Sequence, residues 1–185
     1  MTLPRTLRNF SMFIDGTGFA GRVTELTLPT ISVQTEEYRG GGLDVPVAID
    51  MGIEALTCSF TLAEYDTDVL KLVGLYDQNA VSLTARGALQ RGSEDAVAMI
   101  CNLTGSITSF DPGSLEAGSI TEANFEMAVR YYKLTVANED MIEIDIENCQ
   151  RSIGGTDQLE SVRTALGIGS ETPAEGEPAE ETETT

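Results

Sequence analysis

The stretch Ala-Asn-Phe-Glu-Met-Ala-Val-Arg-Tyr, residues 123–131, decides the fold class because apolar residues occupy all of its odd-numbered positions. Side chains in a β-strand point alternately to its two faces, so this stretch predicts a strand with one buried face and one solvated face. The same alternation recurs in residues 56–62 and 142–147. Half-buried strands of this kind are typical of antiparallel sheets.

Shorter signals extend the strand pattern over most of the chain. Further strand candidates are residues 7–14, 21–28, 31–38, 81–89 and 96–103. Turn sequences lie between strands at residues 15–16, 111–113 and 138–140. Eight or nine strands in one domain predict a mainly β fold, either a β-sandwich or an open barrel of antiparallel sheets.

Two segments carry helical spacing instead. Residues 67–76 are predicted to form the main helix, which packs on a sheet through apolar residues on one stripe: Val69, Leu70, Val73 and Tyr76. Residues 157–166 predict a short C-terminal helix. Asp157 and Glu160 have capping-box spacing at its start, and Gly167 is expected to end it.

The charge of the chain is strongly acidic. Its 185 residues include 30 acidic and 11 basic ones, a formal net charge of −19. Six of the acids lie in the Pro- and Glu-rich residues 171–185, and the remainder still carries −13. We therefore expect one folded domain at residues 1–169 and an acidic disordered C-terminal tail at residues 170–185. An acidic body repels nucleic acid and anionic membranes, so its attractive partners are expected to be proteins.

Targeting signals and cysteine usage point to a cytoplasm-like compartment of synthesis. Residues 1–10 carry two arginines with no apolar core after them, and no apolar run has the length of a membrane helix. Cys58, Cys101 and Cys149 are widely spaced and show no Cys-x-x-Cys pattern. They are predicted to be buried free thiols and not disulfides or zinc ligands.

The residue types of most catalytic sites are missing. The chain has no histidine and only two lysines, which argues against general acid–base catalysis. Glu143, Asp145 and Glu147 alternate along a predicted strand, where side chains two positions apart lie roughly 7 Å from each other, too far to enclose one cation without added ligands. We therefore predict no enzyme activity, metal or cofactor, and assign these acids to an exposed sheet face.

Residues 38–53 are predicted to form a projecting, strand-like arm. Three consecutive glycines at residues 40–42 permit a bend at a high entropic cost, which suggests that something outside the monomer orders them. Val45, Val47 and Ile49 alternate with Pro46 and small or polar residues, as an edge strand would. A hairpin with about six residues per strand projects roughly 20 Å from its parent sheet. A mobile surface loop is the alternative interpretation.

A collinear series of motifs runs along residues 3–169, and its most specific part is Glu-Tyr-Arg-Gly-Gly-Gly at residues 37–42. The other motifs include Leu3-Pro4-Arg5, Leu7-Arg8-Asn9, Phe13-Ile14-Asp15-Gly16, Ile49-Asp50-Met51-Gly52, Arg86-Gly87-Ala88, Tyr131-Tyr132-Lys133-Leu134 and Asp157-Gln158-Leu159. This series resembles the major tail tube protein of contractile-tailed phages of the P2 type, a family related to the tube proteins of type VI secretion and contractile bacteriocins.

The resemblance implies a β-sandwich-like subunit that forms hexameric rings, which stack into the inner tube of a contractile tail. The tube would be a negatively charged conduit for DNA, which passes through without specific binding. Expected partners are copies of the chain itself, the tail sheath, baseplate or initiator proteins, the tail terminator and a tape measure protein in the lumen. The expected location is the virion, with assembly in the cytoplasm of the host bacterium.

Two sets of residues are candidates for contacts in such a tube. The arm would lie between subunits or against an adjacent ring through Tyr38, Arg39, Gly40, Gly41, Gly42, Val45, Pro46, Val47 and Ile49. The acids Glu143, Asp145 and Glu147 would line either the lumen or the outer face. Two alternatives stay open, the tube of a headless contractile bacteriocin or injection machine, and a monomeric β-sandwich binding module. The lack of tryptophan argues against a sugar-binding module.

Overall fold

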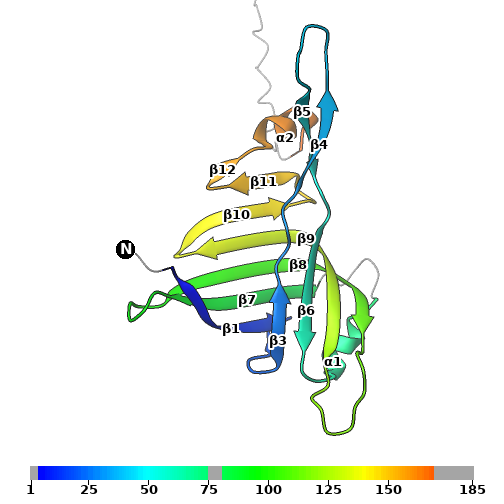
Figure 1. Ribbon diagram of the computed structural model, residues 1–185, viewed down its shortest axis with the longest axis vertical. Helices are drawn as coiled ribbons and strands as arrows, with labels where there is room; N and C mark the ends of the chain where they lie inside the picture. Colours follow the sequence, from blue (N-terminus) through cyan, green and yellow to red (C-terminus); the bar gives the residue numbers. More distant parts are fainter. Residues whose placement is uncertain (1–3, 75–80, 169–185) are drawn as a thin grey trace, which may run out of the picture.

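The computed structural model describes residues 4–74 and 81–168, and a ten-stranded antiparallel sheet forms most of it (Figure 1). Eight strands follow one another in the order β12-β11-β10-β9-β8-β7-β1-β2, while β6 branches from β9 and carries β3. The bounds are β1 Thr6–Ile14, β2 Thr17–Gly18, β3 Val23–Thr27, β6 Leu56–Leu62, β7 Val81–Gln90, β8 Val97–Asp111, β9 Ala123–Val136, β10 Glu139–Asp145, β11 Gln150–Ile153 and β12 Thr156–Asp157. The predicted mainly β, antiparallel fold is confirmed.

The long strand β9 divides this sheet into two layers. Its first half, residues 123–129, pairs with β6, and its second half, residues 131–136, pairs with β10. Strand β8 follows the other edge of β9 through both halves. As a result β3 and β6 run across the direction of β10, β8, β7 and β1 (Figure 1), an arrangement in which two sheets share strands and remain open.

The core fills the space between the layers. Apolar residues make up the whole buried set within the described residues, and each main strand contributes its inward positions, such as Leu83 on β7 and Leu103 on β8. Phe60 on β6 stacks on Phe125 of β9 with ring centroids 5.0 Å apart, and Phe110 of β8 lies 5.1 Å from Phe125. Burial of this apolar surface is the main favourable contribution to folding.

The alternation that predicted β9 changes phase halfway along the strand. Thr104 of β8 pairs with Tyr131, but the next residue, Gly105, pairs with Val129, so Arg130 is the extra residue of a β-bulge. Tyr132, and not Tyr131, is therefore buried. The prediction that the odd-numbered positions stay inward as far as Tyr131 is wrong, because a one-residue shift moves every later side chain to the other face.

Both helices are shorter than the sequence predicted. Helix α1 covers Thr67–Lys71, begins at the N-cap Asp66 and buries Val69, whereas Tyr76 lies outside the described residues. Helix α2 covers Glu160–Leu166 and ends at Gly167, which has the left-handed conformation with φ 69°. The predicted capping box is wrong: the N-cap is Leu159, and Asp157 in β12 accepts a hydrogen bond from the Leu159 amide and pairs with Arg163.

The cysteines are free thiols, as the sequence predicted, but only two of them are buried. Cys58 and Cys101 lie in the core, and burial raises the pKa of each thiol to about 12. Cys149 is half-buried. The described helices are all too short to cross a membrane. The predicted acidic tail at residues 170–185 lies outside the described residues.

Candidate assembly interface

The arm is a separate two-stranded sheet that extends beyond the body. Strands β4, Val33–Tyr38, and β5, Val47–Ile53, pair with each other, from Tyr38 opposite Val47 to Val33 opposite Ile53. They form a hairpin that projects at the top of the view, away from β1, β7 and β8 (Figure 1). The hairpin begins at Val33, five positions before the segment that the sequence marked as the arm.

Large apolar side chains of the hairpin are exposed to solvent. Val45 is 68% exposed, Val47 52% and Ile49 46%. Tyr38 faces the same side as Val47 because the two are cross-strand partners. Val33, Leu43 and Met51 are also exposed, although the sequence did not single them out as interface residues. A monomer rarely exposes so much contiguous apolar surface, and such patches mark sites of protein association.

Two of the three glycines at the tip have a specific structural role. The amide of Leu43 donates to the carbonyl oxygen of Gly40 at 3.2 Å, and Gly42 has φ 91°, as the third position of a type II turn requires. A Cβ atom on Gly40 would lie 3.1 Å from the Tyr38 ring. No heavy atom lies within 4 Å of a Cβ built on Gly41. The turn therefore needs Gly42, and Gly40 lets the Tyr38 ring fold over the tip.

An ion pair ties the base of the hairpin to the body. Nη2 of Arg151 on β11 lies 3.2 Å from Oδ2 of Asp50, and the other Asp50 oxygen accepts a hydrogen bond of 2.7 Å from the Gly52 amide. The Gly52 amide and the Arg151 guanidinium lower the pKa of Asp50. The sequence did not reveal this contact, because it joins residues 101 positions apart.

The three acidic candidates are largely engaged by the chain itself. Glu143 accepts a hydrogen bond from the Tyr131 hydroxyl at 2.9 Å and lies 3.4 Å from Nζ of Lys133. Asp145 accepts the amide and the side-chain nitrogen of Asn148. Glu147 pairs with Arg130 at 3.1 Å. Strand β10 ends at Asp145, so Glu147 lies in the following turn, and the prediction that all three acids alternate along one strand is wrong for Glu147.

The sheets of the subunit have open edges. Within the described residues β3 pairs only with β6, and β1 has a second partner only at Phe13 and Ile14, where β2 adjoins it. Unpaired edges of this kind are templates for pairing with another chain. No group of side chains within residues 4–74 and 81–168 has the composition of a metal site.

An open β-sandwich with free edges and a projecting apolar hairpin defines a structural subunit that is built to associate. A family model described as phage tail tube protein FII matches residues 4–167. The chain therefore belongs to the phage tail tube protein FII family, and the resemblance seen in the sequence is confirmed. As a phage tail tube protein it is a component of the virion.

Two curated relatives support this assignment over nearly the whole chain. The tail tube protein of Escherichia phage P2 is 28% identical over 172 residues, which cover 91% of this chain and 100% of the relative. The major tail tube protein of Serratia phage KSP20 is 32% identical over 172 residues, which cover 91% of this chain and 99% of the relative.

Solved structures share the fold at low sequence identity. The sheath-tube complex of an extracellular contractile injection system, PVC, in its extended state contains a chain with a TM-score of 0.56 and 16% identity, covering 71% of this chain and 91% of that chain. The sheath/tube terminator structure of the same system gives a TM-score of 0.56 and 14% identity, covering 71% of this chain and 96% of that chain.

Proposed function

We propose that this protein forms stacked hexameric rings that make up the inner tube of a contractile phage tail. The family match over residues 4–167 is the observation that carries the proposal. Pairing of free sheet edges between neighbours would close each ring, because it satisfies backbone groups that an isolated subunit leaves exposed. The exposed hairpin supports contact between rings, since its apolar residues find no partner in the subunit itself.

The tube would act as a conduit for the genome. Inside such a tube the DNA has to slide without binding to the wall. An acidic wall permits this because it offers the phosphate groups no basic side chains to bind. The formal charge of −19 supports such a wall. The residues Glu143, Asp145 and Glu147 belong to its luminal or outer face in this proposal, and the charge of two of them is offset by Lys133 and Arg130. The proposal assigns no catalytic step to the chain.

The partners follow from the place of a tube inside a tail. We infer contacts with a sheath protein outside, a baseplate or initiator complex at one end and a terminator at the other, with a tape measure protein in the lumen. Assembly would take place in the cytoplasm of the host bacterium. The similar solved structures, a sheath-tube complex and a sheath/tube terminator of a contractile injection system, support the first and third of these contacts.

A headless contractile injection machine is the second candidate. The structural similarity to the injection-system chains, with a TM-score of 0.56, favours it, but 14–16% identity speaks only for a common fold. The phage relatives at 28–32% identity favour a phage tail. Particles isolated from the producing cells separate the two candidates, because only a phage tail carries a head filled with DNA.

Electron microscopy of the purified full chain tests the tube itself. We expect hollow tubes of constant width in negative stain, composed of rings with six subunits, with light scattering that rises with protein concentration. A variant with Val45 and Val47 replaced by aspartate is expected to stay folded and to form few tubes, since both side chains are exposed. Solitary subunits of the unaltered protein at every concentration and salt level would contradict the proposal.

A further inference from the structure

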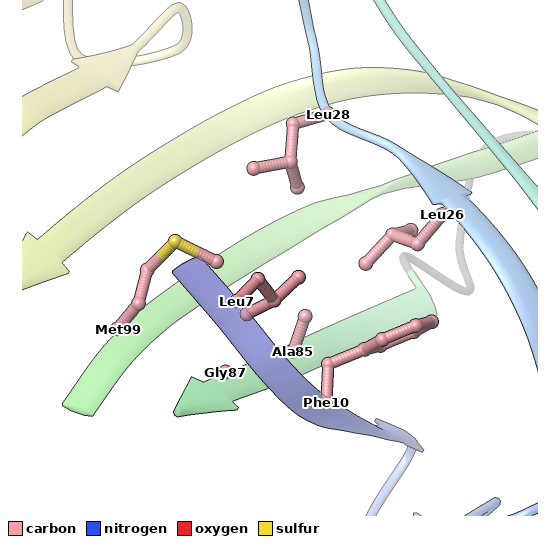
Figure 2. Close-up of a pocket in the computed structure, with 7 residues that line it drawn as sticks. All are labelled: Leu7, Phe10, Leu26, Leu28, Ala85, Gly87 and Met99. Carbon is pink, nitrogen blue, oxygen red and sulfur yellow. The ribbon is translucent and has the colours of Figure 1, made fainter. Parts of the chain in front are cut away.

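An apolar pocket of about 120 Å³ opens between the layers where β3 passes over β1 and β7. Figure 2 shows Leu7 and Phe10 from β1, Met99 from β8, and Leu26 and Leu28 from the β3 segment around it. Leu7 is 49% exposed even though it borders this apolar space. The pocket lining contains no charged side chain.

Small residues on β7 keep the pocket open. Ala85 and Gly87 form its floor, and a Cβ atom on Gly87 would lie only 2.8 Å from Cδ1 of Leu7 and 3.1 Å from Cε of Met99. The space is therefore not filled by the side chains of its own strand. A cavity of about 150 Å³ holds a benzene molecule, so this pocket has the size of one small aliphatic side chain.

Basic residues without an acidic partner in the described residues lie mostly on or beside two of the strands that line the pocket, β1 and β7. Six of the eleven basic residues form ion pairs with acids of the chain. Within the described residues the other five are Arg39 on the arm and four residues on or beside β1 and β7: Arg5, Arg8, Arg86 and Arg91. Arg5 and Arg8 flank Leu7 in sequence, and Arg91 follows Gln90, which pairs with Thr6. Glu94 and Asp95 lie in the turn after Arg91.

The tip of the arm has the complementary properties. Val45 is 68% exposed and is an aliphatic side chain of the size of the pocket. Asp44 precedes it and is exposed, and it makes no ion pair within the described residues. An acidic side chain meets repulsion over most of the surface of a protein of net charge −19. The unpaired Arg5, Arg8, Arg86 and Arg91 on or beside β1 and β7, called the arginine corner below, are therefore a favourable place for Asp44 to dock.

The arm projects at one end of the long axis, whereas β1 and β7, which contribute residues to the pocket, lie in the other half of the molecule (Figure 1). A subunit cannot bring its own arm onto its own pocket in this arrangement. A contact between different surfaces of identical subunits is heterologous and extends without limit when it does not close into a ring. Stacking along the axis of a tube is an assembly of this type.

We propose that the pocket bordered by Leu7, Phe10 and Met99 receives Val45 from the arm of a second copy of this chain, while Asp44 pairs with Arg5 or Arg8 at the rim. This inference rests on the proposed stacking of rings and adds the receiving surface of the arm. It predicts that the pocket and the arginine corner of each subunit are buried in the assembled tube and exposed in the free subunit.

Disulfide trapping in assembled tubes tests this contact. In a background in which Cys149 is replaced by serine, one batch of protein carries V45C and the other L7C, and the native Cys58 and Cys101 are buried. Both introduced thiols replace exposed side chains. We expect tubes of the 1:1 mixture to give a covalent dimer after mild oxidation. A disulfide forms only when the two Cα atoms are about 4.4–6.8 Å apart, and the proposed contact brings residues 45 and 7 of neighbouring subunits close together.

The matched control pairs V45C with V162C on α2, where Val162 is 43% exposed, and should give little dimer.

A charge exchange provides the second measurement, with substitutions that leave the core untouched. D44R alone and R8D alone should each lower the yield of tubes several-fold. The double variant should restore the yield, because each contact between the arm and the arginine corner then has the same two charges with their positions exchanged.

Tubes of normal yield that show no V45C–L7C dimer, or equal trapping of V162C, would overturn the inference and leave the tube function intact. Failure of the unaltered protein to form tubes would overturn both.

Discussion

Gly105 lies at a point where a side chain on β8 would meet the backbone of β9. A Cβ atom on Gly105 would lie 2.0 Å from the carbonyl oxygen of Ala128 and 3.0 Å from Cα of Val129. This glycine stands opposite the bulge at Arg130, where β9 leaves the layer of β6 and enters the layer of β10. The absence of a side chain thus permits the bend that joins the two layers.

Replacing Gly105 with alanine is expected to destabilise the subunit. A methyl group that meets backbone atoms has to displace them, and such overpacking costs about 1–3 kcal/mol or more. Urea unfolding of the isolated subunit measures the loss. G41A is the matched control, because a Cβ on Gly41 meets nothing within 4 Å, and its effect should stay within about 0.5 kcal/mol. Equal stability of G105A and G41A would mean that the backbones can separate freely.

Asp157 holds α2 in place in a way that depends on pH. The Arg163 side chain and then the Leu159 amide donate hydrogen bonds to Asp157 and lower the pKa of its carboxyl group. A carboxyl whose pKa is lower in the folded state stabilises that state above its unfolded value of about 3.9, and the contribution disappears as the pH falls through the folded pKa.

The variant D157N should therefore loosen α2 at pH 7, and its difference from the unaltered protein should shrink as the pH falls below the unfolded pKa of about 3.9 and through the lowered folded pKa. Hydrogen exchange of the amides in residues 160–166, corrected for the intrinsic effect of pH, measures the protection of this helix. D44N serves as control, since Asp44 makes no ion pair within the described residues. A pH-independent difference between D157N and the unaltered protein would show that the charge of Asp157 is not what holds the helix.

At the scale of elements, the arm is a separate hairpin that joins the body only near its base, where Ile53 of β5 packs against the core. Its strands pair only with each other in the described residues, and the Asp50–Arg151 pair joins them to β11. The core lies in the body and includes no residue of β4 or β5 among its buried members. Changes in the arm should therefore affect assembly and leave the stability of the body unchanged.

Replacement of Gly40, Gly41 and Gly42 by alanine tests this separation. We expect a normally folded subunit that forms few long tubes, because Gly42 has φ 91° and a Cβ on Gly40 would meet the Tyr38 ring. Thermal unfolding of the body and electron micrographs of tubes are the two readouts. The single variant G41A should form tubes normally. Micrographs of the triple variant filled with normal tubes would refute the role of the bend.

The sequence predicted elements well where one strand borders one layer. Residues 7–14, 56–62 and 81–89 match β1, β6 and β7 to within one residue at each end. It failed at β8 and β9, which continue for many residues past the predicted ends. In β8 small and polar residues follow Leu103 and give no apolar alternation, although the strand alternates in burial as far as Ile107. In β9 the bulge at Arg130 interrupts the period of two. A bulge depends on the register with the partner strand, and alternation along one chain carries no signal of it.

The projecting arm could be predicted from the sequence, whereas its role as an interface stays a prediction. Glycines and exposed β-branched residues mark the tip of the arm in the sequence itself, so Val45, Val47 and Ile49 could be selected. The Asp50–Arg151 anchor, the pocket beside Leu7 and the cluster of unpaired arginines all depend on contacts between distant segments. Only the fold brings these groups together.

At the scale of the whole molecule, the charge and the open edges act against each other. Sheet edges and the apolar arm favour association, whereas a formal charge of −19 makes subunits repel one another. The repulsion reaches as far as the Debye length, about 30 Å at 0.01 M salt and 8 Å at 0.15 M. Apolar and backbone contacts act only at contact distance, so salt weakens the repulsion more than it weakens association.

Raising the salt concentration should therefore promote tube formation. We expect the fraction of protein that sediments as tubes to increase between about 0.01 M and 0.5 M sodium chloride, since the screening length shortens several-fold over this range. A variant with Glu171, Glu175, Glu177 and Glu180 replaced by glutamine loses four negative charges and should form tubes at lower salt. The ion pair proposed between Asp44 and the arginine corner is weakened by the same salt, but it is short-ranged, and the summed repulsion of the acidic subunits in each proposed ring is expected to outweigh it. Tubes that dissolve steadily as salt is raised would mean that local attraction between charges, and not net repulsion, controls the assembly.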